Sequence, residues 1–230
     1  MTYESILEIV GNQNVAVDHV NEYFKVVKNG RPLYPGSMFE RFENDSNLTR
    51  PNEITSDDLL SLSFLSIKVK PHAIQGIRGE LAQVLTELLA EIPQTLRFED
   101  LSDEEFDKYL GPKSPAQEIW NLLRNKDKPW NVGQTTASKI MARKRPHLIP
   151  IYDYVVAQAV GLDGSLHQWD WWHQAFTNKK KPVLKEQLEE IRTSSGQHHL
   201  SLLRVLDIIL WMHGRNASQT RSEEVVGDDD

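Results

Sequence analysis

Hydrophobic residues recur every three or four positions along most of the chain, which is the spacing of one face of an α-helix. Residues 77–92 are the clearest case, because one apolar stripe runs along them and Pro93 follows directly. The stripe consists of Leu81, Val84, Leu85, Leu88 and Leu89. The same spacing predicts further helices over residues 2–10, 15–27, 56–65, 114–124, 134–143, 154–160, 166–176 and 184–191.

Alternating hydrophobic and polar residues, the pattern of a half-buried strand, are confined to residues 67–70. That segment is too short to build a sheet. We therefore predict an all-α fold, a two-lobed helical bundle. Residues 1–217 are expected to form a single helical unit, in which residues 1–112 and the C-terminal helix make one lobe and residues 113–195 the other.

Polar residues mark where several of these helices begin. Ser102 is followed three residues later by Glu105, and the pair fits a capping box in which each side chain bonds the other's backbone N–H. Thr55 precedes two acidic residues whose charge suits the first turn of a helix. The acidic cluster after Ser102 thus indicates a helix start. The alternative, a metal site, is disfavoured because no histidine lies nearby.

Residues 200–212 are apolar nearly all round, which predicts a helix in the middle of the core. Arg204 and Asp207 interrupt this helix, and a charge in such a place needs a partner. From residue 218 onward the chain consists largely of Ser, Gly and acidic residues, so we predict a disordered acidic tail over residues 218–230.

The composition is that of a globular protein, with 39% hydrophobic and 26% charged residues among 230. Because cysteine is absent, disulfides, thiolate nucleophiles and the usual structural zinc sites are excluded. No stretch reaches the about 18 apolar residues of a membrane span, and residues 1–10 do not resemble a secretion signal. We expect a cytoplasmic protein without membrane contact, metal or cofactor; the sequence does not predict its oligomeric state.

The formal net charge is −7 and the pI is about 5.6. This balance argues against a protein coated in nucleic acid, although the C-terminal segment contributes part of the negative charge. Any contact with nucleic acid must therefore use a local basic patch.

The segment from Val132 to Val156 combines a turn, a helix start, a basic run and a single aspartate. Gly133 and Asn131 both tolerate a positive φ, so a tight turn between two helices is expected here. The helix that starts at Gln134 would direct backbone N–H groups out of the turn, where they can bind a phosphate. Positive charge in the same segment comes from Lys139, Arg143, Lys144 and Arg145.

This segment resembles the helix-hairpin-helix DNA glycosylase superfamily, through the pattern V-G-x-x-T-A and a hydrophobic-Pro-hydrophobic lead into an aspartate. The resemblance implies a glycosylase-like fold with a hairpin that clamps a DNA backbone phosphate. The positions that match the hairpin are Val132, Gly133, Thr136 and Ala137.

Asp153 matches the aspartate that, in this superfamily, stabilises the cationic sugar while water or a lysine attacks it. Thr135 occupies the position of that lysine, so the resemblance implies a monofunctional enzyme that uses water. Two features depart from the superfamily: Asn131 replaces the first glycine of the hairpin, and the iron–sulfur cysteines of some members are absent.

The resemblance to glycosylases covers residues 130–156. The whole chain also resembles an uncharacterised bacterial, largely actinobacterial, family of unknown function. That second resemblance rests on the segments YPGSMFERF, SDDLLSLSFLSI, ARKRPHLIPIYD and LLRVLDIILWM.

Residues expected to contact DNA come from the hairpin and the basic run. They are Val132, Gly133, Gln134, Thr135, Thr136, Lys139, Arg143, Lys144 and Arg145. Asp153 is the candidate catalytic residue, although an aspartate in this setting is often only the cap of the following helix. The basic run could instead pair inside the fold, with Asp207 or Glu118.

A candidate pocket is expected from aromatic residues, namely Tyr34, Phe39, Tyr152, Trp169 and Trp172. Neighbours in a helix are ~100° apart, so Trp169, Trp171 and Trp172 cannot share one face and at least one should lie near the surface. Both core packing and base stacking remain open for this cluster.

The sequence thus predicts a DNA-binding helix-hairpin-helix protein, with hydrolysis of the N-glycosidic bond of a flipped base as its candidate reaction. The alternative is a non-enzymatic helical protein that uses the hairpin as a scaffold for a protein or a small-ligand partner.

Overall fold

The computed structural model describes residues 3–177 and 184–227, with the side chains of residues 3, 4, 47 and 218–227 left out. Within these ranges the chain is helical, and the only extended pairing is an isolated bridge between Val26 and Pro32. The predicted all-α class is confirmed. The predicted strand-like alternation of residues 67–70 forms no strand; Lys70 instead precedes the first helical residue of α5, Pro71–Arg78.

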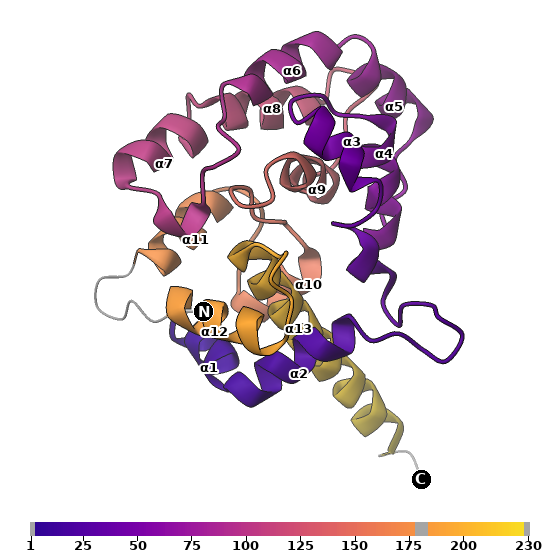
Figure 1. Ribbon diagram of the computed structural model, residues 1–230, viewed down its shortest axis with the longest axis vertical. Helices are drawn as coiled ribbons and strands as arrows, with labels where there is room; N and C mark the ends of the chain where they lie inside the picture. The colour runs from indigo at the N-terminus through magenta and orange to yellow at the C-terminus, as the bar shows by residue number, and fades with distance from the viewer. Residues whose placement is uncertain (1–2, 178–183, 228–230) are drawn as a thin grey trace. The chain divides into compact units, whose positions relative to one another are not determined.

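The chain divides into two compact units (Figure 1). Unit 1 combines residues 1–25 with residues 152–230, and unit 2 consists of residues 26–151. This division differs from the predicted lobes. The N-terminal helices do belong with the C-terminal helix, because they pack against it, but residues 26–112 group with the segment up to residue 151.

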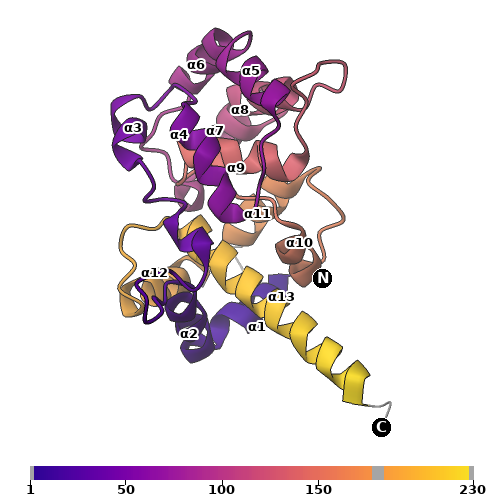
Figure 2. The ribbon, with the colours of Figure 1, turned by 90° about the vertical axis from the view of Figure 1, so that its right-hand side faces the viewer.

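Unit 1 is built around its last helix. Its helices are α1 (Tyr3–Gly11), α2 (Gln13–Tyr23), α10 (Tyr154–Val160), α11 (Gln168–Phe176), α12 (Leu184–Ser194) and α13 (Leu202–Gly227). α13 packs against α1, α2, α10 and α12, and Figure 2 shows these helices beside its first part while its C-terminal part projects away from them. Ile208, Ile209 and Leu210 are fully buried, which confirms the predicted core position. Gly214 permits the close approach of α10, since a Cβ there would lie 2.9 Å from Val155 Cγ1.

The two charges in the first half of α13 have partners within unit 1. Arg204, which is 6% exposed, forms an ion pair with Asp207 and donates a hydrogen bond of 2.9 Å to the Tyr23 hydroxyl. The prediction that these charges need partners is therefore confirmed. Asp207, which the sequence offered as a partner of the basic run, pairs with Arg204 one turn away.

The C-terminal segment differs from the prediction. The backbone of α13 continues as a helix to Gly227, so the tail expected to be disordered from residue 218 is helical over most of its length. The sequence beyond the buried part of α13 contains several good helix formers, which favour continuation of the helix. They are Ala217, Gln219, Arg221 and Glu223. Residues 228–230 lie outside the described residues.

Unit 2 is built around α9, Gln134–Lys144. Its other helices are α3 (Asn44–Thr49), α4 (Ser56–Ser61), α5 (Pro71–Arg78), α6 (Ala82–Ala90), α7 (Asp103–Leu110) and α8 (Pro115–Leu123), with short 3-10 turns η1 (Pro35–Met38), η2 (Leu62–Leu65) and η3 (Phe98–Asp100). α9 packs against α4, α8 and η2, and all of its residues from Ala137 to Lys144 are buried.

The continuous helix predicted over residues 77–92 is wrong. The chain leaves the helix at Gly79, where φ is −111° and ψ is −96°, and α6 starts only at Ala82. A Cβ at Gly79 would lie 2.6 Å from the carbonyl oxygen of Gln75, so this bend requires glycine. The buried Ile77 precedes the bend and the apolar stripe follows it, so the spacing of apolar residues alone did not indicate the bend.

The predicted helix starts are confirmed. Ser102 and Glu105 form a capping box, with hydrogen bonds of 3.1 Å in both directions. Thr55 forms another with Asp58: its hydroxyl accepts from the Asp58 amide, and its own amide donates to the Asp58 carboxylate at 2.8 Å. Ser114 caps α8 through the amide of Gln117.

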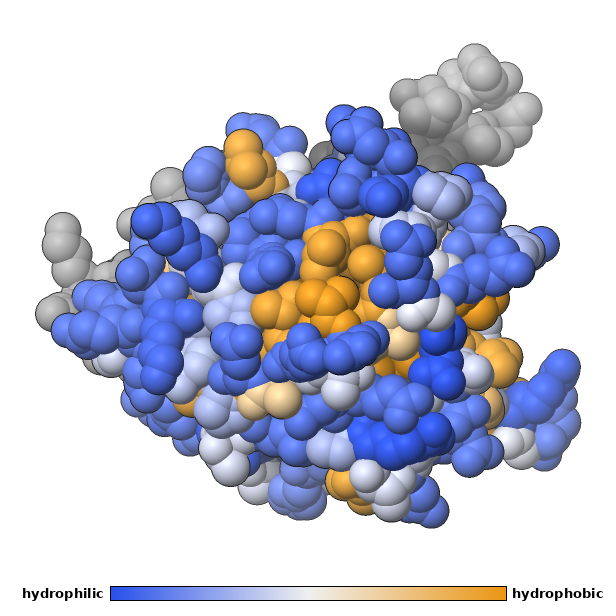
Figure 3. Space-filling view, turned by 90° about the horizontal axis from the view of Figure 1, so that it is seen from above, coloured by the Kyte–Doolittle hydropathy of each residue, from blue (hydrophilic) through white to orange (hydrophobic). Residues whose placement is uncertain are grey.

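Figure 3 views the molecule from above, over the end where α5, α6 and α8 lie, and shows a patch of hydrophobic residues bordered by hydrophilic ones. The helices of residues 3–177 and 184–227 include none that combines the length and the apolar character needed to cross a bilayer.

Candidate functional site

The connection between α8 and α9 comprises residues 124–133 and is not the tight turn that the sequence predicted. Hydrogen bonds from its far end fasten it back onto the end of α8. The Val132 amide donates to the Leu123 carbonyl at 3.0 Å, and the Trp130 indole donates to the Leu122 carbonyl at 3.2 Å. Gly133 is extended, with φ −69° and ψ 165°, so the expected positive φ at this glycine is also wrong.

The start of α9 lies at the surface. Gly133 precedes the first helical residue and is exposed, and no side chain caps the helix through a hydrogen bond. A Cβ added at Gly133 would meet no atom within 4 Å. Residues 134–136 are half-buried, whereas Val132 is 7% exposed and packs inside. The first turn of α9 is therefore partly exposed, and most so at Gly133.

The basic run lies inside unit 2, which corrects its predicted role in DNA contact. The exposed fractions are 4% for Lys139 and 3% each for Arg143, Lys144 and Arg145. Arg143 Nε lies 3.2 Å from Asp58 Oδ1, and Lys144 Nζ lies 3.0 Å from Asp58 Oδ2. The basic run does form an ion pair inside the fold, as the alternative prediction stated. The acidic partner of Arg143 and Lys144 is Asp58, however, and was predicted to be Asp207 or Glu118.

Arg143 and Arg145 also donate hydrogen bonds to backbone carbonyls. Arg143 donates to the carbonyls of Phe39 and Phe42, each at 2.5 Å, and its guanidinium lies 5.9 Å from the centre of the Phe39 ring. Arg145 donates to the carbonyls of Ile92 and Pro51 at 2.8 and 2.9 Å. These contacts fix the segment before α4 and the end of α6 onto α9.

Burial lowers the pKa of two of these cations, Lys144 and Arg145. Burial lowers the pKa of Arg145 to about 10. Burial also lowers the pKa of Lys144, while the charge and the hydrogen bond of Asp58 act in the opposite direction. The cations are thus partly desolvated and depend on Asp58 and on the carbonyls, so they stabilise the fold and do not form a surface patch.

Exposed cations near the start of α9 come from the connection that precedes it. Lys126 and Lys128 are exposed, and Arg124 is half-buried with its guanidinium 5.0 Å from the Trp120 ring. Lys128 lies 5.2 Å from the Trp130 ring and makes an exposed ion pair of 3.9 Å with Glu80. The sequence prediction missed these residues, and the signal for them was the R-N-K-D-K stretch directly before the hairpin.

Asp153 caps α10. Its Oδ1 accepts a hydrogen bond of 3.0 Å from the Val155 amide, so the predicted capping role is confirmed. The side chain is half-buried. Among described residues, no group of three or more His, Cys, Asp or Glu side chains is arranged to hold a metal ion.

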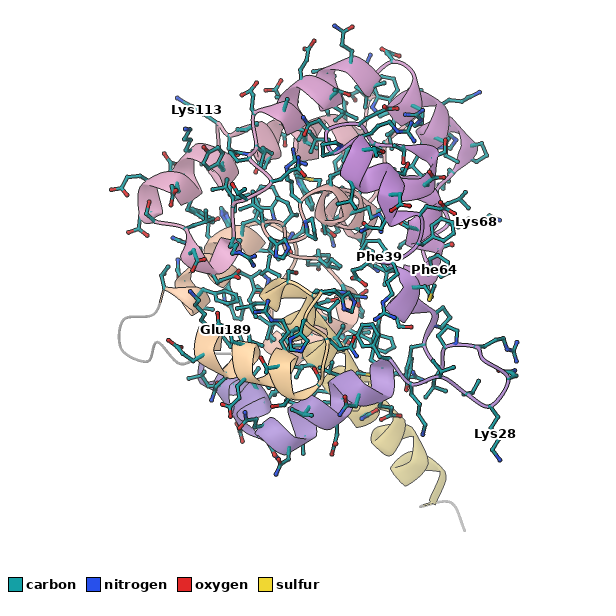
Figure 4. All side chains as sticks on the ribbon, in the orientation of Figure 1. Lys28, Phe39, Phe64, Lys68, Lys113 and Glu189 are labelled. Carbon is teal, nitrogen blue, oxygen red and sulfur yellow. The ribbon has the colours of Figure 1, made fainter. Side chains whose placement is uncertain are left out.

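The predicted site residues are divided between the two units. Residues 132–136, Tyr34 and Phe39 belong to unit 2, and Asp153 belongs to unit 1 with Tyr152, Trp169 and Trp172. Phe39 is a core residue, 3% exposed, and lies among packed side chains in Figure 4, where Lys28, Lys68 and Lys113 point outward.

The tryptophans of α11 divide as the helical spacing predicted. Trp169 and Trp172 are 6% and 4% exposed, whereas Trp171 is half-buried and meets Trp172 edge to face, with ring centres 4.7 Å apart. Tyr152 is also buried.

Residues 16–214 match a family described as a family of unknown function (DUF6308). The chain belongs to this family. The match confirms the predicted resemblance of the whole chain to an uncharacterised family, and it covers α9, Asp58 and Asp153 together. No curated protein and no solved structure matches the chain, and none of these comparisons supports the resemblance to glycosylases.

Proposed function

We propose that this protein binds DNA by holding a backbone phosphate at the N-terminus of α9. The observation that carries the proposal is the start of α9, where Gly133 is exposed, no side chain caps the helix and the space beside Gly133 is open. Backbone N–H groups in a first helical turn point out of the helix, and the helix dipole favours an anion there.

Positive charge for the same phosphate path comes from the connection before α9. Lys126 and Lys128 are exposed on it, and Arg124 lies at its start. In this proposal these three residues supply the positive charge that the sequence analysis assigned to the basic run, because the side chains of the basic run are buried inside unit 2. The contact would be local, in keeping with a chain whose net charge is −7.

The candidate reaction is hydrolysis of an N-glycosidic bond. The electron pair of the C1′–N bond would leave with the base, and a water oxygen would form the new bond to C1′. The proton released by water compensates the charge on the departing base. The Asp153 carboxylate, held by the Val155 amide, would stabilise the cationic sugar between these events.

A second candidate function is non-enzymatic binding of a protein or small-ligand partner through the same hairpin. One observation favours it: the four cations of the basic run are buried, so the surface of the hairpin carries less charge than the sequence suggested.

Gly133→Asp is expected to weaken DNA binding by roughly 10- to 150-fold without lowering thermal stability, since the lost phosphate contacts are each worth about 1.5–3 kcal/mol. An aspartate at this extended position can cap α9 itself, so its carboxylate would occupy the place of the phosphate. Fluorescence anisotropy with a labelled duplex measures the effect. Ser102→Asp, at the exposed cap of α7, adds the same charge to unit 2 and should bind DNA as the wild type does. Equal losses in both variants would point to general repulsion and against the α9 site.

Asp153→Asn is expected to abolish base release while leaving DNA binding and stability unchanged. Asparagine caps a helix as well as aspartate does, so α10 should keep its start while the negative charge is lost. Release of free bases from duplexes with a panel of damaged or modified bases can be followed by chromatography. Asp163→Asn, exposed in the same unit, is the matched control. If the wild type releases no base from any duplex, hydrolysis is excluded and the binding function is what remains.

A further inference from the structure

The segment that joins η2 to α5, residues 66–70, exposes two lysines on unit 2. Ser66, Lys68 and Lys70 are exposed, whereas Ile67 and Val69 between them are half-buried. The alternation of the sequence is therefore retained in the burial of the side chains, although the segment forms no strand. Its outward side is basic and its inward side is apolar.

The backbone on both sides of the two lysines has a defined path. Ser66 ends η2 in the left-handed region, with φ 59°, and the Ile67 amide donates to the Leu62 carbonyl at 3.0 Å. After the lysines, Pro71 is the first residue of α5, and its ring restricts the backbone there. The lysines therefore project from a short segment that is held at both ends.

This segment lies beside the helix that we propose to bind phosphate. Lys139, in the second turn of α9, donates from Nζ to the Leu65 carbonyl at 3.3 Å, and α9 packs against η2. At the other end of the segment, α5 packs against the connection before α9. A Cβ at Gly76 of α5 would lie 2.4 Å from Trp130 Cβ, so the two backbones approach closely. The segment thus starts beside α9 and leads into a helix that contacts the connection before α9.

No described carboxylate neutralises the two lysines. Acidic residues occupy 33 of the 230 positions, but none lies within residues 59–79. Among the described residues, neither Lys68 nor Lys70 forms an ion pair. Arg78 of α5, in contrast, pairs with Glu53 at 2.7 Å. In a chain of net charge −7, the segment is therefore a local positive surface that an anionic partner can neutralise.

We propose that Lys68 and Lys70 bind two further phosphates of the DNA whose backbone is held at the N-terminus of α9. This inference rests on the proposed function and adds a second contact surface to it. Each strand of a duplex carries one phosphate per about 3.4 Å of its axis, so DNA fixed at one phosphate presents others nearby. Lysine binds a phosphate as a point charge and reads no base in doing so. The contact therefore positions the DNA and does not depend on its sequence.

The salt dependence of duplex affinity tests this contact in the full chain. Lys68→Ala/Lys70→Ala should reduce the slope of log affinity against log salt by about 1.8, because each lost phosphate contact removes about 0.9. Between about 50 and 200 mM salt, the loss of affinity should then be about 12-fold smaller than in the wild type. Two duplexes of unrelated sequence should show the same change, because phosphate contacts carry no sequence information.

The matched control is Lys108→Ala/Lys113→Ala, which removes the same charge from two exposed positions of unit 2. Figure 4 shows Lys68 and Lys113 on opposite sides of this unit. The control should keep the wild-type slope. Surface substitutions of this kind change stability little, and circular dichroism checks that both double variants are folded.

The outcomes distinguish this inference from the function on which it rests. If Gly133→Asp weakens DNA binding and Lys68→Ala/Lys70→Ala reduces the slope, both stand. If Gly133→Asp weakens binding but the Lys68/Lys70 variant keeps the wild-type slope, the second contact is wrong and phosphate binding at α9 stands. If only the Lys68/Lys70 variant changes, the lysine contact stands and the α9 site fails.

Two further outcomes would overturn the inference. Equal reductions of the slope in both double variants would show a general effect of net charge. If the wild type binds no DNA, the inference and the proposed function both fall, and retention on phosphatidylserine vesicles would then show that the lysines contact a membrane surface.

Discussion

Asp58→Asn should lower the free energy of unfolding of unit 2 by about 3–5 kcal/mol, the usual effect of removing one partner of a buried ion pair. Asparagine keeps the size of the side chain, and its amide oxygen can still accept from the Thr55 amide in the capping box, so the change removes mainly the charge. Arg143 and Lys144, whose side chains are 2% and 0% exposed, would then be buried without their carboxylate.

Urea denaturation followed by circular dichroism measures this loss. Asp57→Asn, one position earlier in the first turn of α4, is the matched control and should cost at most about 1 kcal/mol, because Asp57 contributes only through the helix dipole. Similar losses in the two variants would mean that Asp58 acts as an ordinary first-turn acid and that the buried cluster contributes little.

Arg204→Met should destabilise unit 1 by about 3 kcal/mol for the same physical reason. The substitution leaves Asp207, whose side chain is 11% exposed, without its guanidinium, and it removes the hydrogen bond to the Tyr23 hydroxyl. Arg215→Met on the same helix is the control. Its guanidinium lies over the Trp211 ring at 5.5 Å, a contact worth about 0.5–1 kcal/mol at an accessible site. A loss at position 204 no larger than at position 215 would contradict the assignment of Arg204 to a buried pair.

Features determined by neighbours in the sequence could be predicted from it. Four such features depend on residues within one or two turns of each other. They are the capping boxes at Thr55 and Ser102, the cap at Asp153 and the buried apolar part of α13. Their physical causes are local hydrogen bonds and helical periodicity, which the sequence displays directly.

Features determined by distant residues could not be predicted. The basic run has the composition of a DNA-binding patch, but its partner Asp58 lies 85 residues before Arg143, in a first turn where acidic residues are common anyway. The bend at Gly79 lies between the buried Ile77 and the apolar stripe that starts at Leu81, so apolar residues flank it on both sides.

The buried cluster gives the two ends of α9 different roles. The C-terminal end is held by Asp58 and by backbone carbonyls, so α9 is a fixed element of unit 2. The N-terminal end remains at the surface with its first turn accessible. A fixed helix with an accessible N-terminus is suited to bind an anion without rearrangement.

Phosphate binding at this end of α9 is tested most directly by the salt dependence of DNA affinity. The dissociation constant for a short duplex should be measured between about 50 and 200 mM salt for the wild type, Gly133→Asp and the double variant Lys126→Ala/Lys128→Ala. Each neutralised phosphate contributes a slope of about −0.9 to the logarithmic plot, so we predict a clear negative slope for the wild type that both variants reduce. A wild-type affinity that does not change with salt would contradict phosphate binding at α9.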